Sequence, residues 1–139
     1  MNVLRFQDRD VFVLDQQEAQ IARLYTAFDR MPEYLGIEYW MHQHALGRSF
    51  TDIAHNFTAS PEFATWYGVQ DNLGFTNTLY QTVLDREGEA SGLSYWATQL
   101  AQGMSRADVM LHFTESPENQ QLTEGATGFI QLVGKTDWV

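Results

Sequence analysis

The sequence predicts a mainly α fold in which two tandem four-helix repeats pack into one domain, with a small terminal β-hairpin or three-stranded sheet. Two observations predict it. An eleven-residue phrase occurs twice along the chain, and both copies show apolar residues at helical spacing between capping signals. The chain has 139 residues, the length of a single domain spanning residues 1–139, and 44% of them are hydrophobic, enough for one core.

The internal duplication is the first of these observations. RMPEYLGIEYW at residues 30–40 is matched by REGEASGLSYW at residues 86–96, and the alignment runs without a gap from 29–62 to 85–118. Of these 34 aligned pairs, 16 are identical. Because packing units are duplicated more often than catalytic sites, we expect the shared residues to be structural. In the central phrase these are Arg30, Glu33, Gly36, Tyr39 and Trp40, and Arg86, Glu89, Gly92, Tyr95 and Trp96.

Each copy is divided into helices by its capping residues. Repeat 1 covers residues 15–67 and repeat 2 covers residues 75–122, with a loop predicted at 68–74. The expected signals are capping boxes, Ser-Pro-Glu helix starts and glycine helix ends. In repeat 1 they are Asp15 and Glu33 as helix starts, Gly47 as a helix end, Ser49 with Asp52 as a box, and Ser60-Pro61. Gly103, Ser105 with Asp108, and Ser116-Pro117 repeat them.

The chain ends differ from the repeats. VLRF and VFVL flank the polar turn QDRD and predict a hairpin within residues 1–14. FIQLVG within residues 128–139 predicts a strand that pairs with it, since an isolated hairpin is marginal in water.

The composition excludes several classes of partner. Eighteen acidic and eight basic residues give a formal charge of −10, which disfavours nucleic acid and anionic membrane surfaces. No run of about 18 apolar residues occurs, so we expect no membrane insertion. The N-terminal stretch lacks the apolar region of a cleavable signal peptide. Without cysteine, the chain has neither disulfides nor thiolate metal ligands.

Catalytic and metal-binding patterns are weak. His42 and His44 are two residues apart on a predicted helix and point to different faces, whereas paired ligands need a spacing of three or four. Asp85, Glu87 and Glu89 alternate like calcium ligands, but the first copy does not repeat the pattern. The Ser-Pro serines have no adjacent base, and no glycine-rich phosphate loop is present. We therefore expect no enzyme, no catalytic residue, no metal and no cofactor.

The linked motifs resemble a known family. The pattern R-x-x-[DE]-x-x-G-[LI]-x-Y-W, a glycine-serine cap and then F-T-x-S-P-E resembles the bacterial domain of unknown function 4214 over about residues 15–122, in two tandem copies. The helical arrangement is similar to the phycobilisome linker domain, a non-catalytic assembly module. The resemblance implies a secreted or surface protein and no catalytic residue. The family's proline is present as Pro32 and is replaced by Gly88 in the second copy.

The functional expectation is a non-catalytic protein-interaction or adhesion module of a bacterial secreted or cell-surface protein, exported without a cleavable signal peptide. Its partner would be an unknown protein or a surface glycan. The alternative is a structural linker in a virion or another supramolecular assembly, and either role is compatible with a larger chain. The first repeat is richer in aromatic and histidine side chains where the copies differ, although several of these positions are equally expected to face the other repeat. The candidate partner-binding residues in and beside these positions are Tyr34, His42, Arg48, His55, Trp66 and Tyr67.

Overall fold

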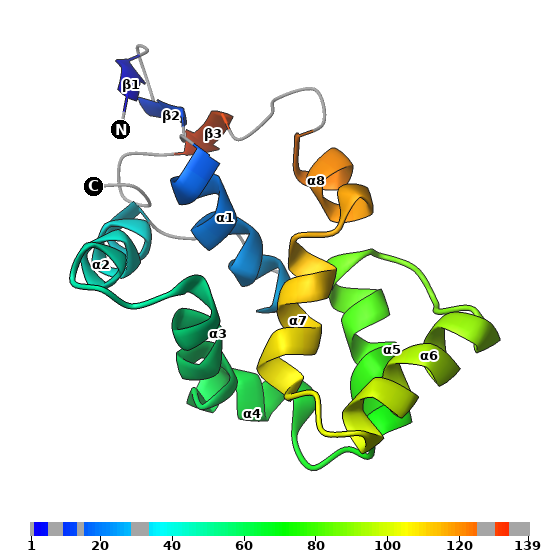
Figure 1. The fold of residues 1–139 in the computed structure, drawn as a ribbon. Helices are drawn as coiled ribbons and strands as arrows, with labels where there is room; N and C mark the ends of the chain where they lie inside the picture. Colours follow the sequence, from blue (N-terminus) through cyan, green and yellow to red (C-terminus); the bar gives the residue numbers. More distant parts are fainter. Residues whose placement is uncertain (1, 6–9, 14–15, 29–33, 125–129, 134–139) are drawn as a thin grey trace.

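The computed structural model describes residues 2–5, 10–13, 16–28, 34–124 and 130–133, and this part of the chain is mainly helical (Figure 1). The predicted mainly α class is therefore confirmed. The helices are α1 (Gln16–Leu24), the 3-10 helix η1 (Tyr25–Phe28), α2 (Tyr34–Ala45), α3 (Phe50–Thr58), α4 (Pro61–Tyr67), α5 (Asn72–Val83), α6 (Ala90–Ala101), α7 (Arg106–Thr114) and α8 (Pro117–Glu124). Three short strands, β1 (Asn2–Arg5), β2 (Asp10–Val13) and β3 (Ile130–Val133), form an antiparallel sheet in the order β1-β2-β3.

The duplication in the sequence has a counterpart in the helix boundaries. Helices α2 and α3 begin 56 residues before α6 and α7 and have the same lengths, and α4 and α8 both begin at the proline of a Ser-Pro pair. The first helices differ, because the second copy has one residue more before its Asp-Arg pair. In the first half the chain tightens into η1 after α1, whereas α5 is one continuous helix. A 3-10 turn rises about 2.0 Å per residue against about 1.5 Å in an α-helix, so fewer residues span the same length.

The capping residues behave largely as their spacing predicts. The Ser49 hydroxyl accepts a hydrogen bond from the Asp52 amide, and the Asp52 carboxylate accepts one from the Ser49 amide, which completes a capping box. Gly47 and Gly103 follow α2 and α6 with φ values of 106° and 109°, the left-handed conformation that glycine adopts at little cost. The predicted loop at 68–74 is too long, because the Asp71 side chain caps a helix that already begins at Asn72. The helix starts expected at Asp15 and Glu33 lie outside the described residues.

Two matching aromatic clusters form the centre of the two halves. They consist of Tyr25, Trp40 and Phe57 in the first half and Tyr80, Trp96 and Phe113 in the second. Each tyrosine meets its phenylalanine edge to face, with ring centroids 5.1 and 4.8 Å apart. Each tryptophan is tilted onto the same phenylalanine at 5.3 and 5.6 Å. The aromatic residues shared by the two copies therefore repeat one packing arrangement.

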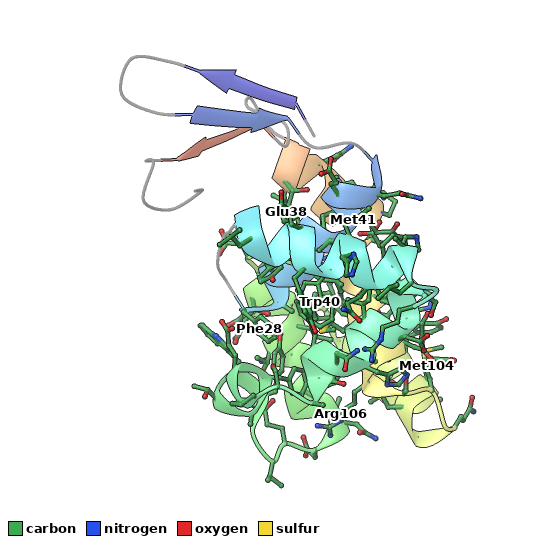
Figure 2. The ribbon with its side chains drawn as sticks, turned by 90° about the vertical axis from the view of Figure 1, so that its left-hand side faces the viewer. Phe28, Glu38, Trp40, Met41, Met104 and Arg106 are labelled. Atoms are coloured by element: carbon green, nitrogen blue, oxygen red, sulfur yellow. The ribbon has the colours of Figure 1, made fainter. Side chains whose placement is uncertain are left out.

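The Tyr-Trp pair does not enter the core as a unit. Trp40 and Trp96 are half-buried and pack against the core, while Tyr39 and Tyr95 are 55% and 56% exposed. Figure 2 shows Trp40 on the side of α2 that faces the other helices. Adjacent helical residues point about 100° apart, so only one of each pair can face inward.

The motif glycine Gly92 is explained by its contact with Tyr80. A Cβ atom at this position would collide with the phenol oxygen of Tyr80, whose ring is buried against Phe113. We expect Gly92→Ala to lower the free energy of unfolding by about 1 kcal/mol. The overpacking against Tyr80 is destabilising, and the higher helix propensity of alanine offsets part of that loss. In a Tyr80→Phe background the same change should be neutral or stabilising, because the nearest remaining ring carbon of Tyr80 is 3.3 Å from that Cβ. Urea denaturation of the four proteins measures this difference, and equal losses in both backgrounds would contradict it.

Candidate functional site

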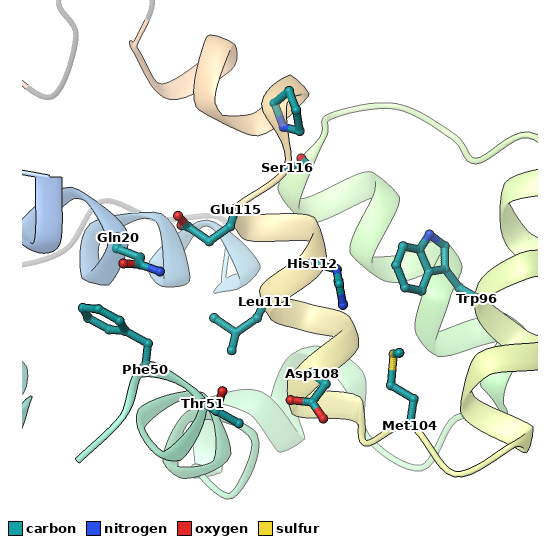
Figure 3. Close-up of a pocket in the computed structure, with 11 residues that line it drawn as sticks. Gln20, Phe50, Thr51, Trp96, Met104, Asp108, Leu111, His112, Glu115 and Ser116 are labelled. Carbon is teal, nitrogen blue, oxygen red and sulfur yellow. The ribbon is translucent and has the colours of Figure 1, made fainter. Parts of the chain in front are cut away.

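An open groove with a volume of about 590 Å³ crosses α7 (Figure 3). Its floor is the outward stripe of α7, and its walls come from α1 and α3 on one side and from α6 and the loop after it on the other. The floor residues are Asp108, Leu111, His112 and Glu115, and the wall residues are Gln20, Phe50, Thr51, Trp96 and Met104, with Ser116 and Pro117 at one end.

The floor follows from the periodicity of α7. Positions 108, 111, 112 and 115 have the i, i+3, i+4, i+7 spacing of one helix face. The opposite face of α7 is buried in the core through Ala107, Val109, Met110 and Phe113. Helix α7 therefore fixes the core with one face and presents the groove floor with the other.

Aromatic contacts hold the walls of the groove in place. Phe50 stacks on His44 with ring centroids 4.3 Å apart, and the Nδ1 atom of that histidine lies 2.8 Å from the carbonyl oxygen of Arg48. On the other side, Trp96 contacts His112 with centroids 5.3 Å apart. Phe50, Trp96, Met104 and Leu111 all pack against the buried core while remaining partly exposed.

A long-range ion pair closes one end of the floor. Arg23 of α1 is only 6% exposed, and its Nε and Nη2 atoms donate to the two carboxylate oxygens of Glu115 at 2.7 and 2.8 Å. The bidentate pair joins residues 92 positions apart in the sequence. Sequence reasoning missed both residues. The available signal was Arg23 itself, an arginine among the apolar residues of a helix predicted to face the core.

The shared arginine of the second copy, Arg86, forms ion pairs with two glutamates. The Arg86 guanidinium donates to both carboxylate oxygens of Glu118 at 2.8 and 3.0 Å and to Glu89 at 2.9 Å. The guanidinium also lies over the ring of Tyr80, 5.0 Å from the ring centroid, which is a cation–π contact. Arg30 and Glu33 of the first copy lie outside the described residues.

This ion pair gives stability a defined dependence on pH. Hydrogen bonding to Arg86 lowers the pKa of Glu118 below its ordinary value of 4.5. A lowered pKa stabilises the fold above the ordinary value, and the stabilisation is lost as pH falls through the lowered value. Because both side chains are partly exposed, we expect Glu118→Gln to cost only about 0.5–1 kcal/mol at pH 7. Denaturation curves of both proteins from neutral to acidic pH should converge, and a constant difference would contradict this cause.

The groove has the composition of a binding surface. Among the described residues, no group of three or more histidine and acidic side chains is arranged to hold a metal. In the same part of the chain, no hydrogen bond joins Asp108 to His112, and the Glu115 carboxylate accepts hydrogen bonds from Arg23. The described tyrosines with raised pKa values, Tyr67 and Tyr80, are affected chiefly by burial in the core. The groove presents apolar side chains with the Asp108 carboxylate beside them.

The residues proposed from the sequence lie elsewhere. His42, Arg48, His55 and Trp66 are exposed but do not line the groove, and the side chain of Tyr34 lies outside the described part of the chain. Sequence reasoning named Asp108 only as a cap. The i, i+3, i+4, i+7 stripe of α7 was the signal that could have found the groove floor.

The assignment of Tyr67 to a partner surface is wrong. Tyr67 is 1% exposed, and its hydroxyl donates to the carbonyl oxygen of Ala27 at 2.7 Å and lies 2.9 Å from Oγ1 of Thr82. The ring faces inward from α4, where it stacks on Phe63. Its neighbour Trp66 is 41% exposed.

These features define a small helical protein in which α2 and α3 have the same lengths as α6 and α7, with an open groove across one helix. A family model described as a domain of unknown function, DUF4214, matches residues 54–123, from within α3 to α8. The chain belongs to this family. No curated protein and no solved structure matches it. None of the described helices combines the length and apolar character needed to cross a membrane.

Proposed function

We propose that this chain is a non-catalytic protein-interaction module that binds its partner in the groove across α7. Support comes from what the shared residues do. The tryptophans, phenylalanines, Arg86 and the capping serines have packing, ion-pair or capping roles in the fold. The groove instead combines aromatic and aliphatic walls with polar groups, the composition of an interaction surface.

The difference between the two halves is the observation that carries the proposal. In the first half, the hollow that contains Trp40, Asn56 and Ser60 has a volume of only about 140 Å³. The groove that contains the equivalent Trp96, His112 and Ser116 has about 590 Å³, and Gln20, Phe50 and Thr51 of the first half form its other wall. The larger hollow therefore lies where the two halves meet, and the equivalent surface beside Trp40 holds only the smaller one. We infer that the larger hollow serves binding.

The proposal also includes the location of the protein. We place it among bacterial secreted or cell-surface proteins, where a net charge of −10 favours solubility. We also propose that the first half is a diverged copy of the family unit, since its helices α2 and α3 keep the boundaries of α6 and α7. Immunodetection of the natural protein in medium, surface and interior fractions tests the location, and an exclusively interior protein would favour the assembly-linker alternative.

Site-specific photo-crosslinking in the producing cells tests the function. A photoreactive amino acid replaces Thr51, an exposed residue at the edge of the groove, or Thr65, an exposed threonine of α4 that does not line it. We expect a discrete protein adduct from position 51 and none from position 65. The same adducts from both positions, or none from position 51, would contradict binding in the groove.

A further inference from the structure

We propose that the groove across α7 binds a segment of another protein in which a lysine or arginine lies beside a large apolar side chain. This inference rests on the proposed interaction function and adds the chemistry of the partner. It follows from the apolar walls of the groove, from the Asp108 carboxylate and from the distance between that carboxylate and the apolar side chains.

The apolar half of the groove is anchored and only partly covered. Phe50, Trp96, Met104 and Leu111 each have one side against the buried core and another toward the groove. Side chains fixed in this way lose little conformational freedom on binding, so contact with them is favourable for an apolar partner group. An aromatic or branched aliphatic side chain is the group that such a surface accepts.

The charge of the groove favours a cation. The carboxylate of Glu115 is compensated by Arg23. No donor in the described part of the chain forms a hydrogen bond or ion pair with the carboxylate of Asp108, although the Asp108 amide donates to the Ser105 hydroxyl. The equivalent Asp52 accepts a hydrogen bond from the Ser49 amide, so the two copies use the same aspartate differently. In a chain with a net charge of −10, this free carboxylate attracts a basic partner group.

The spacing on α7 sets the distance between the two partner groups. Asp108 precedes Leu111 and His112 by three and four residues on one helix face, which places their Cβ atoms about 5–6 Å apart. A lysine or arginine one helical turn from an apolar residue matches this separation. The equivalent surface of the first half has Arg48 and His55 in place of Met104 and Leu111, and a basic segment would be repelled there.

Titration with a designed peptide pair tests the inference. The probe is a synthetic amphipathic peptide of leucine, tryptophan and lysine, and its control has glutamate in place of every lysine. We expect the basic peptide to shift the indole signal of Trp96 in NMR spectra and to bind more weakly as salt is raised. Asp108→Asn should weaken its binding about threefold to fivefold, the effect of one partly exposed ion pair. The matched variant Asp52→Asn should leave the affinity unchanged.

Several results would overturn the inference. They are equal binding of the acidic peptide, equal losses from Asp108→Asn and Asp52→Asn, or binding of a neutral oligosaccharide at Trp96 in preference to the basic peptide. Self-association of the chain that Asp108→Asn abolishes would identify a second copy as the occupant and would also overturn it. If a crosslinked adduct still forms from position 51 in any of these cases, the interaction function stands and only the partner chemistry is wrong. Loss of that adduct would contradict both the interaction function and the proposed partner chemistry.

Discussion

Replacing Tyr67 with alanine is expected to lower the free energy of unfolding by about 3–5 kcal/mol, the usual cost of truncating a large buried aromatic residue. The ring contacts Phe63 and Phe75, and the hydroxyl joins η1 to α5 through Ala27 and Thr82. Its removal leaves a cavity where these elements meet. Chemical denaturation monitored by circular dichroism measures the loss.

Two further substitutions separate the contributions at this position. Tyr67→Phe keeps the ring and removes the hydroxyl, and we expect it to cost about 1 kcal/mol because one hydrogen-bonded group is lost. Trp66→Ala removes a larger but partly exposed ring from the same helix and should cost less than about 1 kcal/mol. A Trp66→Ala protein less stable than Tyr67→Ala would show that the orientation of α4 is wrong.

Glu115→Ala is expected to destabilise the protein by about 1.5–3 kcal/mol, because it removes two charge-assisted hydrogen bonds to the buried Arg23 guanidinium. The loss exceeds that of an exposed pair because the Arg23 side chain is almost inaccessible to water. Thermal unfolding followed by calorimetry measures it.

The natural control is Glu118→Ala, three residues further along the chain. Glu118 also forms a bidentate pair with an arginine, but both partners are partly exposed, at 36% and 42% for the Arg86 and Glu118 side chains. We expect a loss of about 0.5–1 kcal/mol. Equal losses for the two glutamates would contradict the difference in burial.

Local signals in the sequence predicted the helical part of the fold. Ser49 and Ser60 cap helices because their hydroxyls can reach an amide three residues further on, a contact within one turn of the chain. The duplicated phrase likewise predicted two equivalent packing units, and the paired clusters around Phe57 and Phe113 are their physical form.

Tertiary contacts could not be predicted from such local signals. The sequence does not say which of two adjacent aromatic residues, Trp66 or Tyr67, faces inward, since that depends on how α4 is rotated against η1 and α5. The Arg23–Glu115 pair joins opposite ends of the chain and has no local spacing. The groove depends on the packing of α1, α3 and α6 around α7, so its residues are brought together only in the folded chain.

The central claim is that the groove across α7 binds the partner. Its most direct test places the photoreactive amino acid at Gln20, on one wall of the groove, and introduces Thr51→Arg on the same wall or Thr65→Arg on α4. We predict that Thr51→Arg abolishes the adduct by obstructing and repelling a basic partner, while stability changes by no more than about 0.5 kcal/mol. Thr65→Arg should leave both the adduct and stability unchanged. An adduct of undiminished yield in the Thr51→Arg protein would contradict the claim.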